Sequence, residues 1–156
     1  MRRTALVLVL AALAATAAVG SDSAASAACK PGIRVVGKTT YRVFCGPASA
    51  SVKVSGKTHS FRHGTCLRVG NKVFTLSIGT LTMSKGKPKY SYLGATVPAA
   101  KKDGLYKRAV VTWAYGGKRY SLYNVNVQLA GKRTRGTFSG QIVGRAGKVT
   151  GSFRCR

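Results

Sequence analysis

Acidic residues are almost absent from this sequence. Its 156 residues include 27 lysines and arginines but only two aspartates, Asp22 and Asp103, and no glutamate. Hydrolysis by paired carboxylates needs two acids side by side, and a calcium site needs several carboxylate oxygens, so neither is expected. Asp103 stands in a Lys-Lys-Asp-Gly segment that is typical of a turn. With so few proton acceptors, we expect that the protein is not an enzyme.

Serine catalysis also lacks its usual motif. Ser139 lies in Gly-Thr-Phe-Ser-Gly, which does not have the G-x-S-x-G spacing of a nucleophile elbow, and no helical segment follows it. A Ser-His-Asp triad would have to combine Asp103 with His59 or His63. We therefore interpret Ser139 as a strand residue between glycines and expect no catalytic residue.

A metal site is not expected either. His59, His63 and Cys66 form the nearest approach to a ligand set, with the spacing H-x3-H-x2-C. Two histidines four residues apart share a face on a helix, but this stretch has strand character, and four strand residues span about 13 Å. Cys66 is also expected in a disulfide. We interpret His59 and His63 as surface or edge residues and expect no cofactor.

Long apolar runs are missing except near the beginning of the chain. Residues 5–19 are almost entirely Ala, Leu and Val, follow Arg2 and Arg3, and precede small residues that end in Ala-Ser-Ala at 25–27. This pattern indicates a secretory signal peptide, and the run is shorter than the roughly 20 residues that span a bilayer as a helix. We predict a signal peptide over 1–27, a single secreted β domain over 28–156 and no transmembrane helix. The protein is expected outside the cell, either free or associated with the cell wall.

Four cysteines follow the predicted cleavage site: Cys29, Cys45, Cys66 and Cys155. An even number in an oxidising compartment favours disulfides, and four cysteines allow three pairings. We prefer Cys29–Cys45 with Cys66–Cys155, because the first pair brackets a hairpin-sized loop and leaves the last cysteine to close the chain. The alternative for Cys29 is a lipid anchor. Small residues precede it at 26–28, but the leucine of a lipobox is missing, so the disulfide is preferred.

No segment after residue 27 shows a helical period. Apolar runs of five to nine residues, rich in Val, Thr, Tyr, Phe and Ile, alternate with Gly, Asn-Lys or Lys-Pro. This pattern predicts an all-β fold, a small disulfide-stapled antiparallel β-sandwich or barrel of about 8–10 short strands. The longest hairpin is expected over 106–129, around Gly116 and Gly117, and a closing hairpin over 136–155.

Three segments need an interpretation of their own within this pattern of strands and turns. Residues 58–62 and 66–69 are expected to be separate strands around Gly64. Residues 85–89 are expected to be a basic loop, because Pro88 and its charged neighbours disfavour a central strand. Residues 99–104 are the one place where a turn of helix is allowed.

Basic residues interleaved with aromatic ones are the remaining functional signal. Loss of residues 1–27 would remove Arg2, Arg3 and Asp22 and leave 25 lysines and arginines against Asp103, a formal charge of +24. Cations that meet phosphates and rings that stack on bases or sugars suit a polyanion groove. The candidate anion-binding residues are Lys87, Lys89, Tyr90, Lys107, Arg108, Lys118, Arg119, Lys132, Arg133 and Arg135. The ordinary alternative is that the aromatics are strand residues and the charges mark exposed faces, but it does not explain why the charge has a single sign.

These observations predict a non-enzymatic secreted or cell-envelope protein with a strongly basic β surface. Its expected partners are anionic polymers or surfaces, such as wall polymer, phospholipid headgroups or nucleic acid. The alternative hypothesis is a surface antigen or structural envelope module with no specific ligand.

Short motifs, the first ending at Cys66 and the last at Cys155, resemble a known family. They are the approach to a cysteine in Gly-Lys-Thr-His-Ser-Phe-Arg-His-Gly-Thr-Cys, the alternating Val-Phe-Thr-Leu-Ser-Ile-Gly, and the final Gly-Ser-Phe-Arg-Cys. In this order the chain resembles the mycobacterial 19-kDa lipoprotein antigen family and similar small actinobacterial secreted proteins. The resemblance implies a compact β fold, a Cys66–Cys155 bridge and a secreted or envelope location. It implies no catalytic residues, and the extreme basicity is not part of its pattern.

Overall fold

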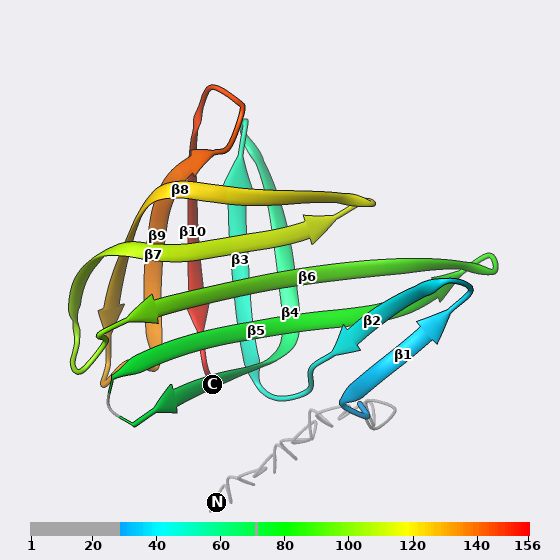
Figure 1. Ribbon diagram of the computed structural model, residues 1–156, viewed down its shortest axis with the longest axis horizontal. Helices are drawn as coiled ribbons and strands as arrows, with labels where there is room; N and C mark the ends of the chain where they lie inside the picture. The colour runs from blue at the N-terminus through cyan, green and yellow to red at the C-terminus, as the bar shows by residue number, and fades with distance from the viewer. Residues whose placement is uncertain (1–28, 71) are drawn as a thin grey trace, which may run out of the picture.

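The computed structural model describes residues 29–70 and 72–156, so the predicted signal peptide over 1–27 lies outside the described residues (Figure 1). In this described part the chain forms strands and turns without a helix. The strands are β1 (Gly32–Val36), β2 (Thr39–Val43), β3 (Ala48–Val54), β4 (Lys57–Val69), β5 (Val73–Ser84), β6 (Lys87–Pro98), β7 (Gly104–Tyr115), β8 (Lys118–Ala130), β9 (Arg135–Ile142) and β10 (Lys148–Arg154). The predicted all-β class is confirmed, and β4 to β8 are longer than expected, at 12 or 13 residues each.

Strands β3 to β10 form one closed antiparallel barrel. Each strand pairs with the next one along the chain, and β10 pairs with β3 to close the ring. The closing ladder joins Ser49–Lys53 to Thr150–Arg154. Closure pairs each strand of the ring on both sides, except where part of a strand extends beyond its neighbour, as the first residues of β6 extend beyond β7. Of the two predicted architectures, sandwich and barrel, the structure is therefore the barrel.

Strands β1 and β2 form a separate two-stranded sheet, called here the arm, which lies beside the projecting ends of β5 and β6 (Figure 1). The Phe44 N–H donates a hydrogen bond to Gly79 O over 2.8 Å. The Tyr90 hydroxyl donates to Arg42 O, also over 2.8 Å. Gly79 has no room for a Cβ, because Arg42 O and the Phe44 ring lie against it. The arm is thus docked on the barrel by close backbone approach and by one tyrosine.

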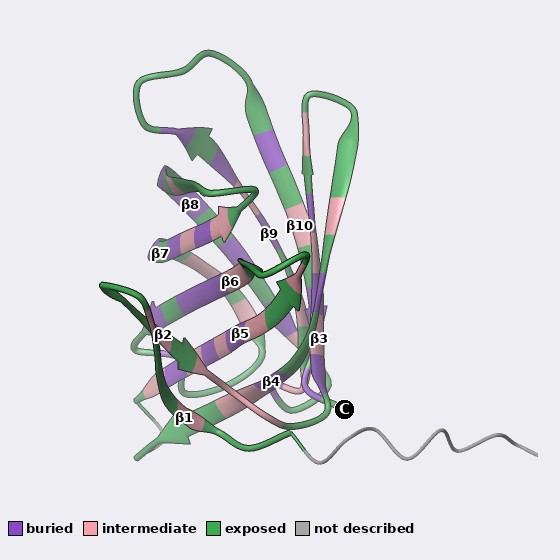
Figure 2. Cartoon of the chain, turned by 90° about the vertical axis from the view of Figure 1, so that its right-hand side faces the viewer, coloured by how far each residue is buried: buried purple, intermediate pink, exposed green. Residues whose placement is uncertain are grey.

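Alternation along each strand fills the barrel interior. Inward-facing residues are buried and outward-facing residues are exposed, which appears as stripes on β5 to β8 in Figure 2. The largest fully buried side chains are Trp113, Phe74, Leu76, Ile78, Leu93, Leu129, Val52, Val97, Val111, Val125, Val127 and Val149. An eight-stranded barrel is just wide enough for such side chains to meet at its axis. The interior is therefore mainly a packed core.

The closing hairpin β9–β10 places each phenylalanine opposite a glycine. The register pairs Phe138 with Gly151 and Phe153 with Gly136. A Cβ on Gly151 would overlap the ring of Phe138, and one on Gly136 would crowd the ring of Phe153. The Phe153 ring also stacks on Phe74, with centroids 5.4 Å apart. Each ring of this hairpin therefore needs a glycine opposite it on the paired strand, because a side chain there would overlap the ring.

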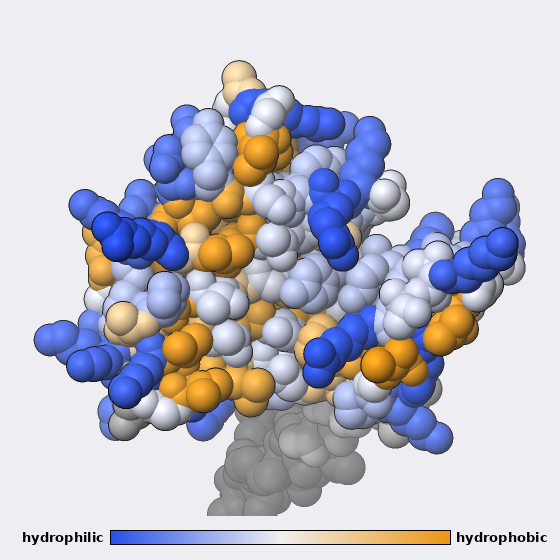
Figure 3. Space-filling view, viewed as in Figure 1, coloured by the Kyte–Doolittle hydropathy of each residue, from blue (hydrophilic) through white to orange (hydrophobic). Residues whose placement is uncertain are grey.

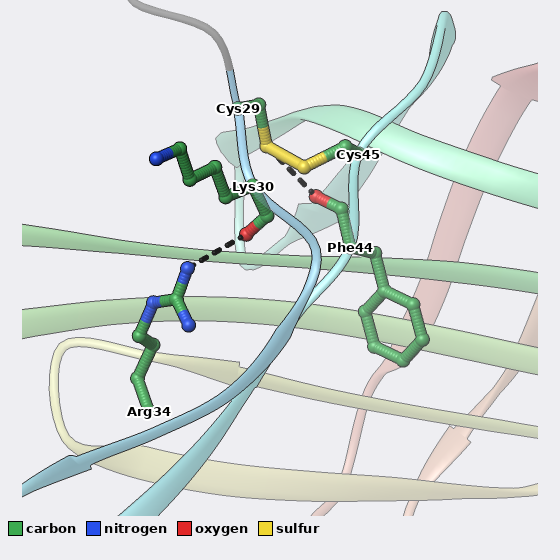
Figure 4. The surroundings of a disulfide bond; sticks show 5 residues. All are labelled: Cys29, Lys30, Arg34, Phe44 and Cys45. Atoms are coloured by element: carbon green, nitrogen blue, oxygen red, sulfur yellow. Dashed lines mark hydrogen bonds between the residues drawn. A yellow bond between two sulfur atoms is a disulfide. The ribbon is translucent and has the colours of Figure 1, made fainter.

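Two disulfides join Cys29 to Cys45 and Cys66 to Cys155, with Cα atoms 5.7 and 5.6 Å apart. This is the pairing that was preferred from the sequence. Figure 4 shows the first bridge at the base of the arm, where the Phe44 carbonyl lies beside Cys29. In this arrangement the Cys29 sulfur is bonded to Cys45 and is not available for a lipid.

One strand replaces the two that were expected around Gly64. β4 pairs with β3 through its first half and with β5 from Gly64 onward. The register shifts between Ala48 and Ala50, and His63 has a φ of 64°. Such a bulge bends a strand without ending it. The prediction of two strands was wrong because a glycine at a bulge looks like a glycine at a turn.

Two further segments differ from expectation. Lys87, Pro88 and Lys89 belong to β6, and the turn is confined to Lys85 and Gly86. β7 pairs with β6 only over 92–96, so Pro88 lies where β6 is an edge strand and no partner needs its missing N–H. The segment 99–103 contains no turn of helix. It is a connection in which the Ala100 N–H donates to Lys72 O over 2.8 Å.

Candidate functional site

The ten candidate anion-binding residues are distributed over four places in the fold. Three lie on the projecting half of β6, two at an irregular point of β7, two at the tip of the β7–β8 hairpin and three at the β8–β9 turn. In that order they are Lys87, Lys89 and Tyr90; Lys107 and Arg108; Lys118 and Arg119; and Lys132, Arg133 and Arg135. Hydrophilic side chains project around the periphery of the face shown in Figure 3. The structure therefore gathers these residues into a charged exterior and not into a single groove.

Arg133 is an exception, because it is buried. Only 9% of it is exposed, and its Nη1 donates to Ala100 O over 2.7 Å. The backbone N–H groups of Lys132 and Arg133 donate to the Asp103 carboxylate over 2.9 and 2.7 Å. The guanidinium of Arg133 thus ties the β8–β9 turn to the 99–103 connection and does not lie on the exposed surface.

Asp103 takes part in the same contacts between the β8–β9 turn and the 99–103 connection. The hydrogen bond from the Lys132 N–H is the largest of the effects that lower the pKa of the Asp103 carboxyl; burial opposes it, and the Arg133 N–H and two guanidinium groups add to it. Both Lys132 and Arg133 have positive φ, at 59° and 62°, which turns their N–H groups toward the carboxylate. The chain bends at Lys102 and Asp103 before β7 begins, and the Asp103 carboxylate holds the β8–β9 turn in place.

The side chain of Tyr90 contacts the arm. Its ring lies 5.1 Å from Tyr41 and stacks on Tyr92 with centroids 6.3 Å apart. Burial is the main effect that raises the pKa of its hydroxyl, which donates to Arg42. The ring is therefore a structural contact more than a free stacking platform, while Lys87 and Lys89 beside it are exposed.

The end of the barrel near the β3–β4 and β7–β8 turns contains a hollow of about 520 Å³, called here the barrel mouth. Its lining residues are Val54, Ser55, Gly56, Lys57, His59, Trp113, Tyr115, Tyr120, Ile142, Arg145, Ala146, Gly147 and Lys148. Trp113 and Tyr120 stack with centroids 4.8 Å apart, and the rings of His59 and Tyr115 lie 4.4 Å apart. Arg145 was not among the sequence candidates, and its guanidinium lies 5.6 Å from the Tyr120 centroid.

A second, shallower hollow of about 490 Å³ lies on the outer surface of β8, β9, β10 and β3. Hydroxyl and amide side chains line most of it, and the Ser51 and Ser152 hydroxyls are 3.1 Å apart. Ser139 belongs to this outer face, where it pairs with Asn126 and Thr150 on the neighbouring strands. It is a strand serine, as predicted.

His59 and His63 occupy different surroundings. His59 lines the barrel mouth beside Tyr115, whereas His63 is exposed at the bulge of β4. Among residues 29–70 and 72–156, no three His, Cys, Asp or Glu residues come together as a metal site would require. Cys66 is bonded to Cys155.

Comparison of the chain with protein-family models, with curated proteins and with solved structures finds no match. The resemblance to the 19-kDa lipoprotein antigen family therefore stays a prediction. No helix in the described part of the chain is long and apolar enough to cross a membrane.

Proposed function

We propose that the protein is a non-enzymatic secreted or cell-envelope protein whose basic exterior associates with anionic polymers or surfaces. The observation that carries the proposal is the one-signed charge: residues 28–156 hold 25 lysines and arginines, and their single acid is Asp103. That carboxylate already accepts two backbone hydrogen bonds. The exterior therefore has almost no internal counter-charge, and anions from outside the molecule are its natural complement.

The placement of the cations suits a long partner without a defined sequence. Lys87, Lys107, Lys118, Lys132 and Arg135 are exposed on four different parts of the barrel. Charges spread in this way attract a polyanion from many directions, and each contact with it releases a condensed counterion. Their mutual repulsion also destabilises the folded chain at low ionic strength, so a bound polyanion would stabilise the fold. Wall polymer, phospholipid headgroups and nucleic acid all offer the required charge.

The proposal is tested by salt-graded binding of residues 28–156 to immobilised heparin, to DNA and to vesicles that contain phosphatidylglycerol. We expect strong retention that is lost only above several hundred millimolar salt. The logarithm of the binding constant should fall linearly with the logarithm of the salt concentration. A variant with Lys87, Lys89, Lys118 and Arg119 changed to Gln should elute at lower salt. The matched control replaces Thr137, Ser139, Thr150 and Ser152, which are outward-facing and uncharged, with Ala.

Three outcomes are informative. Retention on one support far above the others would identify the class of partner. Equal and weak retention on all supports would favour the structural module without a specific ligand. Flow-through on every support at low salt would overturn the proposal.

A further inference from the structure

The barrel mouth combines four rings, arranged in two contacting pairs, with an opening to solvent. Trp113, which lines the mouth, is only 1% exposed, whereas Tyr115 is 43% exposed. His59 and Tyr115 contact each other, and the Phe61 ring meets Tyr115 edge-on at 6.5 Å. The rings hold one another in fixed orientations, so they form a wall whose shape exists before any ligand arrives.

The mouth lies at the end of the barrel near the β3–β4 and β7–β8 turns. Elsewhere the inward-facing positions are filled by Phe, Leu, Ile and Val, which leave a packed core. At this end the glycines and alanine of the neighbouring turns, Gly56, Ala146 and Gly147, leave the mouth open. Its volume of about 520 Å³ lies within the roughly 300–1,000 Å³ of small-molecule sites, and the mouths of β-barrels are frequent places for such sites.

Cations surround the opening of the mouth. Lys57 comes from the start of β4, Lys148 from the start of β10, and Arg145 from the loop between β9 and β10. Arg145 lies over the face of Tyr120, a cation–π contact that ties the loop to the wall. No carboxylate is among the described residues that line the mouth, and Asp103 stands at the opposite end of the β7–β8 hairpin, where Gly104 pairs with Leu129. Within residues 29–70 and 72–156, three positive charges therefore line the opening without a neighbouring acid.

We propose that the barrel mouth binds a small molecule that joins one flat ring to an anionic group, a phosphate or a carboxylate. The ring lies against the wall formed by His59 and Tyr115, and the anion meets Arg145 with Lys57 and Lys148. An aromatic ring gains from stacking on tyrosine, and a guanidinium can bind a phosphate or carboxylate through two parallel hydrogen bonds. This site does not rest on the association of the exterior with polyanions, since a long polymer needs no pocket.

Trp113 makes the site directly observable, because it is the single tryptophan of the chain and lines the mouth. The test titrates residues 28–156 at near-physiological salt with adenosine 5′-monophosphate and with 4-hydroxybenzoate, following tryptophan fluorescence at an excitation that the probes do not absorb. Adenosine supplies a ring without the anion, and ribose 5-phosphate supplies the anion without a flat aromatic ring. Isothermal calorimetry repeats each titration, so that a ligand that leaves the fluorescence unchanged is still detected.

Adenosine 5′-monophosphate and 4-hydroxybenzoate are the two complete probes, because each carries both a ring and an anion. We expect saturable binding of at least one of them, with an affinity at least about tenfold higher than that of adenosine or ribose 5-phosphate. A preference between the two complete probes tells a phosphate ligand from a carboxylate ligand. Arg145→Gln should weaken probe binding about tenfold and lower the melting temperature only slightly, because the variant also loses the cation–π contact with Tyr120. The matched control is Lys53→Gln, which removes one charge from the outer face of β3 and should leave probe binding unaltered.

Two results would overturn the proposal. One is the absence of saturable binding of both complete probes by fluorescence and by calorimetry. The other is an equal loss of affinity in Arg145→Gln and Lys53→Gln, which would show that general electrostatic attraction binds the probe. Retention of both variants on heparin separates this result from a failure of the polyanion proposal, because neither change removes more than one exterior charge.

Discussion

Glycine at positions 136 and 151 is required by packing and not by backbone conformation. Both lie inside the barrel, where each leaves space for a phenylalanine on the neighbouring strand, Phe153 and Phe138 respectively. Neither has the positive φ that makes glycine necessary at a turn. The rings they admit fill the interior of the closing hairpin, so the four residues act as one packing unit.

Gly151→Ala is predicted to destabilise the barrel by about 1–3 kcal/mol, because the added methyl group overlaps the Phe138 ring and forces it from its rotamer. Chemical denaturation measures the change. Thr150→Ala, at the next position and facing outward, serves as the control. Combining Gly151→Ala with Phe138→Leu should recover part of the loss, and a double mutant that is simply additive would contradict the packing argument.

At this scale the sequence predicts the strand pattern but not the partners of single residues. The motif Gly-Ser-Phe-Arg-Cys indicates a strand that ends in a cysteine. Nothing in it shows that Gly151 faces Phe138, because that contact depends on the register of β10 against β9. Arg133 is a further case. From the sequence, Arg133 was expected to be an exposed cation. Only the fold reveals that its guanidinium is buried and donates to Ala100 O.

The two disulfides belong to different structural elements. Cys66–Cys155 joins the middle of β4 to the residue after β10 and so fastens the end of the barrel. Cys29–Cys45 closes the arm, which lies outside the ring of eight strands (Figure 4). The Tyr90 hydroxyl, which donates to Arg42 O, and the ring contacts Tyr41–Tyr90 and Phe44–Tyr92 link the arm to the barrel. The two bridges should therefore stabilise different parts of the molecule.

Replacing Cys66 and Cys155 by Ser is predicted to reduce the free energy of unfolding of the barrel by about 4 to 5 kcal/mol, because the bridge closes a long loop. Replacing Cys29 and Cys45 by Ser should change it by less than about 1 kcal/mol but speed trypsin cleavage at Arg34 and Lys38 in the arm. Thermal unfolding and limited proteolysis of both double variants measure the two effects. Equal loss of barrel stability in the two variants would contradict this division.

Elements with strong alternation were predicted well, and elements with an irregular feature were not. The β7–β8 hairpin around Gly116 and Gly117 is found where the sequence placed it. The bulge at His63 and Gly64 and the edge position of Pro88 were missed, because both depend on which neighbouring strand lies alongside. The barrel mouth was missed for the same reason: its rings come from β4, β7 and β8, and only closure of the barrel brings them together.

On the scale of the whole molecule, stability in acid depends on very few groups. Asp103 is the only acidic side chain in residues 28–156, and its pKa is lowered chiefly by the hydrogen bond from the Lys132 N–H. A carboxyl with a lowered folded-state pKa stabilises the protein above its unfolded value of about 3.9, and that contribution is lost as pH falls through the folded value. Most proteins titrate many carboxyls in this range, whereas here one side chain dominates.

We therefore predict that the melting temperature falls below about pH 4 in a single step that Asp103→Asn abolishes. At neutral pH the Asn variant should melt lower than the parent, because an amide cannot accept both backbone hydrogen bonds as a carboxylate does. Scanning calorimetry over this pH range makes the comparison. An acid transition that is the same in both proteins would show that another group is responsible.

The ladder between β3 and β10 has a consequence for how the chain folds. Every other ladder of the barrel joins strands that are neighbours in sequence and can form as a local hairpin. This one brings residues 49–53 to residues 150–154, so it must wait until nearly the whole chain is ordered. Loop-closure entropy opposes such a contact, and proteins rich in distant pairings fold slowly, in milliseconds to seconds. We expect ring closure to be the late, rate-limiting event, with an open and aggregation-prone sheet preceding it.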